Sequence, residues 1–120
     1  MPKLFHDVLR EKMDEFVHLV YRITKSFPPE ERYGATSQLR RASLSVILNY
    51  IEGFARGRRL VKINFFEVSL GSLQESRYLL EFSCKEAWIE NADEYDRSMQ
   101  LAKEIAAMLW KTIENLRREP

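Results

Sequence analysis

Residues 36–55 read TSQLRRASLSVILNYIEGFA and are the most apolar stretch of the 120-residue chain. One row of side chains recurs every three or four residues: Leu39, Ser43, Val46, Tyr50 and Phe54. A second row, which is apolar throughout, follows another side of the same helix: Leu44, Ile47, Leu48 and Ile51. The spacing predicts an α-helix, and the two rows predict that it is buried on two sides, whereas a surface helix needs only one apolar stripe.

Amphipathic helices are also predicted on both sides of this stretch. The preceding helix ends near Lys25, because Phe27-Pro28-Pro29 cannot continue it, and its apolar row is Leu9, Met13, Phe16, Val20, Ile23 and Phe27. Gly53, Gly57 and the basic run at 56–59 mark the end of the central helix. A third helix is expected over about 60–87, on Ile63, Phe66, Leu70, Leu73, Leu80 and Cys84. After a break at 88–91, Asn91 with Glu94 resembles a capping box, and a fourth row follows: Tyr95, Met99, Ala102, Ala106, Leu109, Ile113 and Leu116.

Four long helices with short links predict an all-α fold, an antiparallel up-down-up-down four-helix bundle, as one domain over residues 1–120. The chain is 45% hydrophobic with a formal net charge of +1, which argues against disorder. The lone cysteine, Cys84, excludes an intramolecular disulfide and lies at a core-like position, which favours a buried inert thiol. No apolar run could span a bilayer, and the charged N-terminus lacks a signal-peptide core, so a cytoplasmic protein without membrane contact is expected.

Catalytic motifs are not supported by the sequence. Glu15-Phe16-Val17-His18 is a Glu-x-x-His motif of the kind used by di-iron bundles, but such a site needs a second copy, and none occurs. Gly53 and Gly57 lack the Lys-Ser/Thr pair of a phosphate-binding P-loop. We therefore expect a non-enzymatic protein with no cofactor and no metal.

A polar stripe follows one face of the central helix: Gln38, Arg41, Ser45, Asn49, Glu52 and Arg56. A structural role is the favoured interpretation, with Glu52 pairing with Arg56 and with Ser45 and Asn49 bonded to neighbouring helices or water. The alternative is a ligand site whose arginine and amide groups face a phosphate backbone. The two interpretations are compatible, because a ligand can complete a satisfied polar face.

Charge is distributed unevenly along the chain. Residues 32–62 hold seven basic residues and one acid, whereas residues 67–104 hold nine acids and four bases. A basic segment of this kind is typical of nucleic-acid contact, unless the acidic helices neutralise it. The candidate phosphate contacts are Arg40, Arg41, Arg56, Arg58, Arg59 and Lys62. Tyr50 and Phe54 offer possible stacking surfaces, but their place in the first apolar row favours core positions.

Four motifs occur in order: Phe27-Pro28-x-x-Glu31-Arg32-Tyr33-Gly34, Ser37-Gln38-Leu39-Arg40-Arg41-Ala42-x-x-Ser45, Asn49-x-x-Glu52-Gly53-x-x-Arg56 and Gly71-Ser72-x-x-Glu75. Together they resemble the four-helix-bundle proteins encoded in intervening sequences of bacterial 23S ribosomal RNA genes. The resemblance implies an up-down bundle that assembles as a ring-like homopentamer. It also implies kinship with accessory proteins of diversity-generating retroelements, which bind nucleic acid and a reverse transcriptase. Ala35 and the bulky pair Tyr50-Ile51 depart from the family pattern, which affects the packing around the polar stripe.

The leading hypothesis is a homo-oligomeric module that binds nucleic acid, RNA by preference, through phosphate contacts without reading sequence. Oligomerisation would cover the second apolar row, which a monomer would leave exposed. On this view a set of polar residues organises the helix–helix interior or a subunit junction: Gln38, Ser45, Asn49, Glu52, Ser72 and Glu75. The alternative is a protein-interaction scaffold that docks a partner such as a reverse transcriptase or a ribosome-associated protein.

Overall fold

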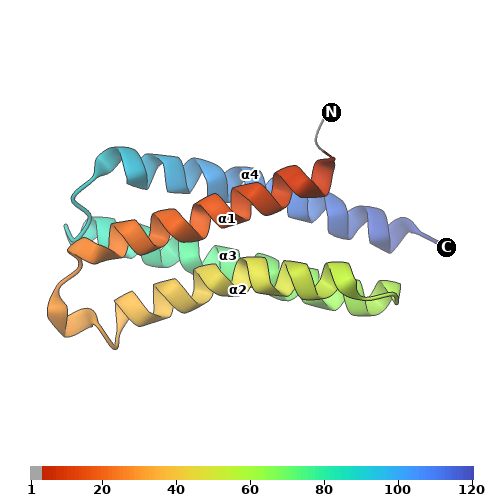
Figure 1. The fold of residues 1–120 in the computed structure, drawn as a ribbon, viewed down its shortest axis with the longest axis horizontal. Coiled ribbons are helices and arrows are strands. Elements are labelled where there is room, and N and C mark those ends of the chain that lie inside the picture. The colour runs from red at the N-terminus through yellow and green to blue at the C-terminus, as the bar shows by residue number, and fades with distance from the viewer. Residues whose placement is uncertain (1–3) are drawn as a thin grey trace.

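The computed structural model describes residues 4–120, which form four long α-helices lying side by side (Figure 1). The helices are α1 (Phe5–Ile23), α2 (Ala35–Ala55), α3 (Arg59–Lys85) and α4 (Ala92–Arg118). Two short 3-10 helices, η1 (Thr24–Ser26) and η2 (Pro29–Glu31), connect α1 to α2. No strand occurs between residues 4 and 120, which confirms the all-α prediction. The first three residues, part of the segment in which no signal peptide was expected, lie outside the described residues.

The links between the helices lie at two opposite ends of the molecule. Figure 1 shows the α1–α2 and α3–α4 links at one end, and the α2–α3 link at the other end, where α1 starts and α4 ends. Helix α1 packs against α2 and α4, and α3 packs against the same two helices. The most extensive contact is between α2 and α3. Segments that are far apart in sequence therefore meet at each end of the bundle.

The helix boundaries agree with the predicted ones to within about two residues. Capping interactions explain where α3 ends and where α4 begins. Helix α3 ends at Lys85 because Ala87 adopts a left-handed conformation with φ of 62°. The Trp88 N–H then donates to the Ser83 carbonyl and the Ala87 N–H to the Cys84 carbonyl, both at 3.0 Å, which is a Schellman motif. At the start of α4, the Glu94 N–H donates to Asn91 Oδ1 at 3.0 Å, which confirms the predicted cap.

The core is built from one apolar row of each helix. In α2 the first row is buried from Leu39 through Val46 to Tyr50, as predicted. The prediction for Cys84 is wrong, because this thiol is exposed. The buried row of α3 continues from Leu80 by three residues to Ser83, not by four to Cys84. Ser83 tolerates burial because its hydroxyl donates to the Leu79 carbonyl at 2.7 Å.

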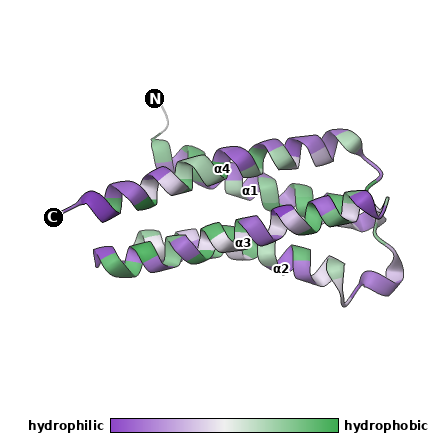
Figure 2. Ribbon diagram, turned by 180° about the vertical axis from the view of Figure 1, so that it is seen from behind, coloured by the Kyte–Doolittle hydropathy of each residue, from purple (hydrophilic) through white to green (hydrophobic). Residues whose placement is uncertain are grey.

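The second apolar row of α2 is not covered within one chain. Leu48 is 54% exposed, and Leu44, Ile47 and Ile51 are only partly buried. Hydrophobic residues also interrupt the polar surface of α3 toward its start, as Figure 2 shows in green, and Val68 of this helix is exposed. The prediction that α2 is buried on both sides is therefore not met by the single chain. None of the helices between residues 4 and 120 is long and apolar enough to cross a membrane.

Candidate nucleic-acid interface

The close contact between α2 and α3 depends on small residues. The Ser69 hydroxyl donates to the Val46 carbonyl at 2.6 Å, and the Ser45 and Ser72 hydroxyls are 2.8 Å apart. Gly53 faces α3 where even a Cβ atom would lie 2.7 Å from Phe66 Cε1. Gly53 was expected only to mark a helix end, but it lies within α2 and permits this contact.

The polar stripe is largely satisfied by its own residues. Asn49 Nδ2 donates to the Ser45 carbonyl at 2.9 Å and to Ser45 Oγ at 2.8 Å. Arg56 pairs with Glu52 at 2.7 Å, as predicted. A depression of about 430 Å³ lies beside these groups, lined by Gln38, Arg41, Ala42, Ser45, Ser72 and Glu75. The favoured structural interpretation accounts for the middle of the stripe, while Arg41 and Glu75 form no ion pair with any of the residues described.

Besides Arg56, which pairs with Glu52, three of the six predicted phosphate contacts are held by hydrogen bonds. Arg40 Nε donates to Thr24 Oγ1 at 2.8 Å, and its guanidinium lies 4.7 Å from the centre of the Tyr21 ring. Arg59 Nη1 donates to the Leu116 carbonyl at 3.2 Å. Lys62 Nζ donates to the carbonyls at the end of α2, at 2.9 Å to Phe54. These three side chains form hydrogen bonds to the ends of neighbouring helices. The bonds fix the positions of Arg59 and Lys62 near the α2–α3 link.

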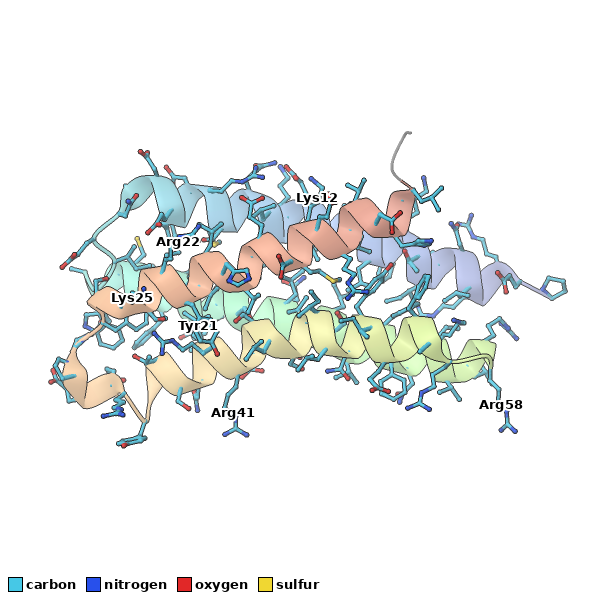
Figure 3. All side chains as sticks on the ribbon, viewed as in Figure 1. Lys12, Tyr21, Arg22, Lys25, Arg41 and Arg58 are labelled. Carbon is cyan, nitrogen blue, oxygen red and sulfur yellow. The ribbon has the colours of Figure 1, made fainter. Side chains whose placement is uncertain are left out.

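Arg41 and Arg58 are exposed and are not neutralised by the acidic helices. Figure 3 shows both side chains pointing away from the bundle, and no acid within residues 4–120 pairs with either of them. They do not form one site, because a helical rise of about 1.5 Å per residue places Arg41 about 20 Å from the end of α2. Two cations of α1 behave differently, since Lys12 pairs with Glu104 and Arg22 with Glu94 of α4.

The structure adds cations that charge counting along the sequence missed. The end of α4 lies beside the start of α3, where Arg59 reaches Leu116 and Arg117 pairs with Glu67. This contact places the end of α4, which carries Lys111 and Arg118, at the same end of the bundle as the α2–α3 link (Figure 1). We call this end of the bundle the basic end, and its cations are Arg56, Arg58, Arg59, Lys62, Lys111 and Arg118. Within the described part of the chain, no acid pairs with Arg58, Lys111 or Arg118.

An apolar depression of about 340 Å³ opens at the basic end. Its walls include Phe5, Tyr50, Phe54 and Phe66, with Lys62 and Lys111 among its polar residues. The expected core position of Phe54 is wrong, because half of this residue is exposed in the last turn of α2, beyond the core. Tyr50, one turn earlier, is buried, and this burial, with the negative charge of Asp7, raises its pKa to about 12.

The two polar residues of the Glu-x-x-His motif make separate contacts. His18 is exposed on α1, with Nε2 3.4 Å from Asp14 Oδ1. Glu15 instead pairs with Arg97 of α4 at 2.8 Å, and this hydrogen bond lowers the pKa of Glu15. No group of three potential metal ligands gathers anywhere in residues 4–120.

Comparison with known proteins places this bundle in a family. No curated protein matches the chain. The crystal structure of a protein with unknown function from the S23 ribosomal protein family of Bacteroides thetaiotaomicron VPI-5482 superposes with a TM-score of 0.82 at 22% sequence identity. The match covers 92% of this chain and 99% of that chain, and it shows the four-helix fold. The family model described as 23S rRNA-intervening sequence protein matches residues 7–111, which include all four motifs that carry the resemblance. The chain therefore belongs to the family of 23S rRNA-intervening sequence proteins.

Proposed function

We propose that this chain is the up-down-up-down subunit of a non-enzymatic homo-oligomer that binds RNA through its basic end. The observation that carries the proposal is that Arg58, Lys111 and Arg118, from two segments far apart in sequence, lie at the same end of the bundle, and that none of them pairs with an acid among the described residues. Cations free of acidic partners attract phosphates without reading bases, so the binding is expected to be strong at low salt and independent of sequence. RNA is favoured over DNA because of the family's association with 23S ribosomal RNA genes.

The oligomer is supported by the uncovered second row of α2. Apolar surface that is left uncovered in the middle of α2 is unfavourable in a monomer, and a second copy of the chain would bury it. A ring of subunits, such as the homopentamer that the resemblance implies, would also repeat the basic end and strengthen its attraction for a polyanion.

Replacing Leu48 by glutamate should dissociate the oligomer, because it places a charge in the proposed subunit contact. Light scattering should give several subunits for the wild type and a mass near 14.3 kDa for Leu48→Glu. Trp110→Glu is the matched control, since Trp110 is exposed to the same extent but lies on α4. A wild-type monomer, or an unchanged mass for Leu48→Glu, would contradict this part of the proposal.

Reversing two charges at the basic end should weaken RNA binding at least about tenfold. The variant is Arg58→Glu with Arg118→Glu, and the control is Lys25→Glu with Lys85→Glu, which changes net charge equally at the opposite end. Affinity for a single-stranded RNA is measured at several salt concentrations. The slope of log affinity against log salt should become shallower by about 0.7 for each phosphate group that the variant no longer binds, and only in the first variant. Equal effects of both variants would mean that the basic end is not the RNA site.

A protein-interaction scaffold is the second candidate, because the same uncovered row of α2 could dock a different protein. This function predicts negligible RNA binding by the wild type together with saturable capture of one partner, such as a reverse transcriptase or a ribosome-associated protein. Capture should then be abolished in Leu48→Glu and retained in the double charge reversal at the basic end.

A further inference from the structure

The apolar depression at the basic end has the features of a site for a flat, anionic ligand. All four helices contribute to it, through His6 of α1, Phe54 of α2, Phe66 of α3 and Thr112 of α4, among other residues. Its volume of about 340 Å³ is within the range of small-ligand sites. Aromatic walls with a few polar groups at the rim are typical of such sites.

Phe54 is the wall residue best placed to contact a ligand. Its ring centre lies 4.6 Å from that of His6 and 6.2 Å from that of Tyr50, yet half of the residue remains exposed. Tyr50 is itself stacked on Phe66 at 5.3 Å, so the support behind Phe54 is packed into the core. A ring that packs against aromatic neighbours and is still half exposed can serve as a stacking platform.

Positive charge lies next to this platform. Lys62 Nζ is 5.6 Å from the centre of the Phe54 ring and is fixed by hydrogen bonds to the Gly53 and Phe54 carbonyls. An ammonium group has three donors, so one remains for a ligand. Lys111 lines the same depression from α4 and forms no ion pair with a residue described here, while Glu119 is the acid at the rim.

We propose that this depression takes an unstacked base of single-stranded RNA, with the base on Phe54 and its phosphate near Lys62 and Lys111. The inference rests on the function proposed above and narrows it from RNA to its single-stranded form. A base in a duplex is stacked on both faces and its ring is not available, whereas a base in a single strand can swing out onto an aromatic side chain. Attraction between the RNA phosphates and the cations of the basic end would bring the strand to the depression.

The test uses a fluorescently labelled oligoadenylate and a duplex of the same length, with binding measured by anisotropy. Phe54→Leu keeps an apolar side chain but removes the ring, and should weaken single-strand binding about tenfold because the base no longer has a ring to stack on. Its salt slope should stay at the wild-type value, and its duplex affinity should not change. Phe54→Tyr keeps a ring and should bind like the wild type, and the unchanged duplex affinity of Phe54→Leu would show that its weaker single-strand binding is not a folding defect.

Tyr78→Leu is the control, because Tyr78 is an exposed aromatic residue of α3 outside the depression. If Phe54→Leu binds oligoadenylate as tightly as the wild type while the charge reversal at the basic end still weakens binding, only the base site is wrong. If the wild type binds neither RNA, the proposed function fails together with the base site. Equal weakening in Phe54→Leu and Tyr78→Leu would also overturn the assignment to this depression.

Discussion

Replacing Gly53 by alanine should lower the free energy of unfolding by about 1 to 3 kcal/mol, although alanine is the better helix former. The added Cβ atom would lie 2.7 Å from Phe66 Cε1 and 2.9 Å from Phe65 Cβ. Phe66 is buried and stacked on Tyr50, so its ring cannot move aside without disturbing the core. The two helices must therefore separate, at the cost of their packing.

Gly71→Ala is the matched control, since Gly71 lies within α3 with no atom within 4 Å of an added Cβ. This variant should raise the free energy of unfolding by about 0.5 to 1 kcal/mol, because only the helix propensity changes. Urea unfolding followed by circular dichroism measures both values. The opposite signs separate steric contact from helix propensity, and a higher free energy of unfolding for Gly53→Ala as well would show that the packing of α2 on α3 does not require a glycine.

The second large effect concerns alkaline pH and Tyr50. Burial, aided by the charge of Asp7, raises the pKa of Tyr50 to about 12 in the folded chain, from 10.0 for a free tyrosine. The folded state therefore holds the phenol proton more tightly than the unfolded state does. The resulting contribution to stability is complete below about pH 10 and is lost as pH rises toward 12. It amounts to about 2 to 3 kcal/mol, from 1.36 kcal/mol per pKa unit.

Tyr50→Phe should remove this pH dependence, since phenylalanine keeps the ring and has no proton to lose. The measurement is the difference in unfolding free energy between wild type and variant, followed from about pH 8 to pH 12. The difference should be constant below about pH 10 and then shift in favour of the variant. Burial also raises the pKa of Tyr95. Because Tyr95 is present in both proteins, its contribution cancels in the difference. A constant difference up to pH 12 would mean that the Tyr50 phenol is accessible to water.

Much of the fold follows from local patterns. Apolar spacing places each helix because its 3.6-residue period depends only on neighbours along the chain. The Asn91 cap and the break at Phe27-Pro28-Pro29 are equally local, since one side chain or one ring decides each. The motifs around α2 also identify the family, because they lie within the stretch that the family model matches.

Periodicity was less informative near the helix ends. Phe54 continues the buried row of α2, and Cys84 continues the row of α3, yet both are exposed. For Phe54, spacing gives the direction of the side chain, but burial also requires close packing by neighbouring helices at that level of the bundle. For Cys84, the row could step from Leu80 by three residues or by four, and the structure buries Ser83 instead. Conversely, Gly53 was interpreted from the sequence only as a signal for the end of a helix. In the structure, α3 approaches α2 so closely at Gly53 that no methyl group would fit.

The candidate interface was the part that only the tertiary structure could decide. The sequence determined four amphipathic helices, their family and a basic segment at residues 32–62, because each of these is a property of consecutive residues. The set of cations that lie near one another depends on how helices that are distant in sequence pack together. Packing of α4 against α3 places Lys111 and Arg118 at the same end of the bundle as Arg58. Contacts with residues of the preceding helices hold Arg40 against Thr24 and Tyr21. Electrostatic attraction follows distance in space, so the basic end emerges only when the bundle is folded.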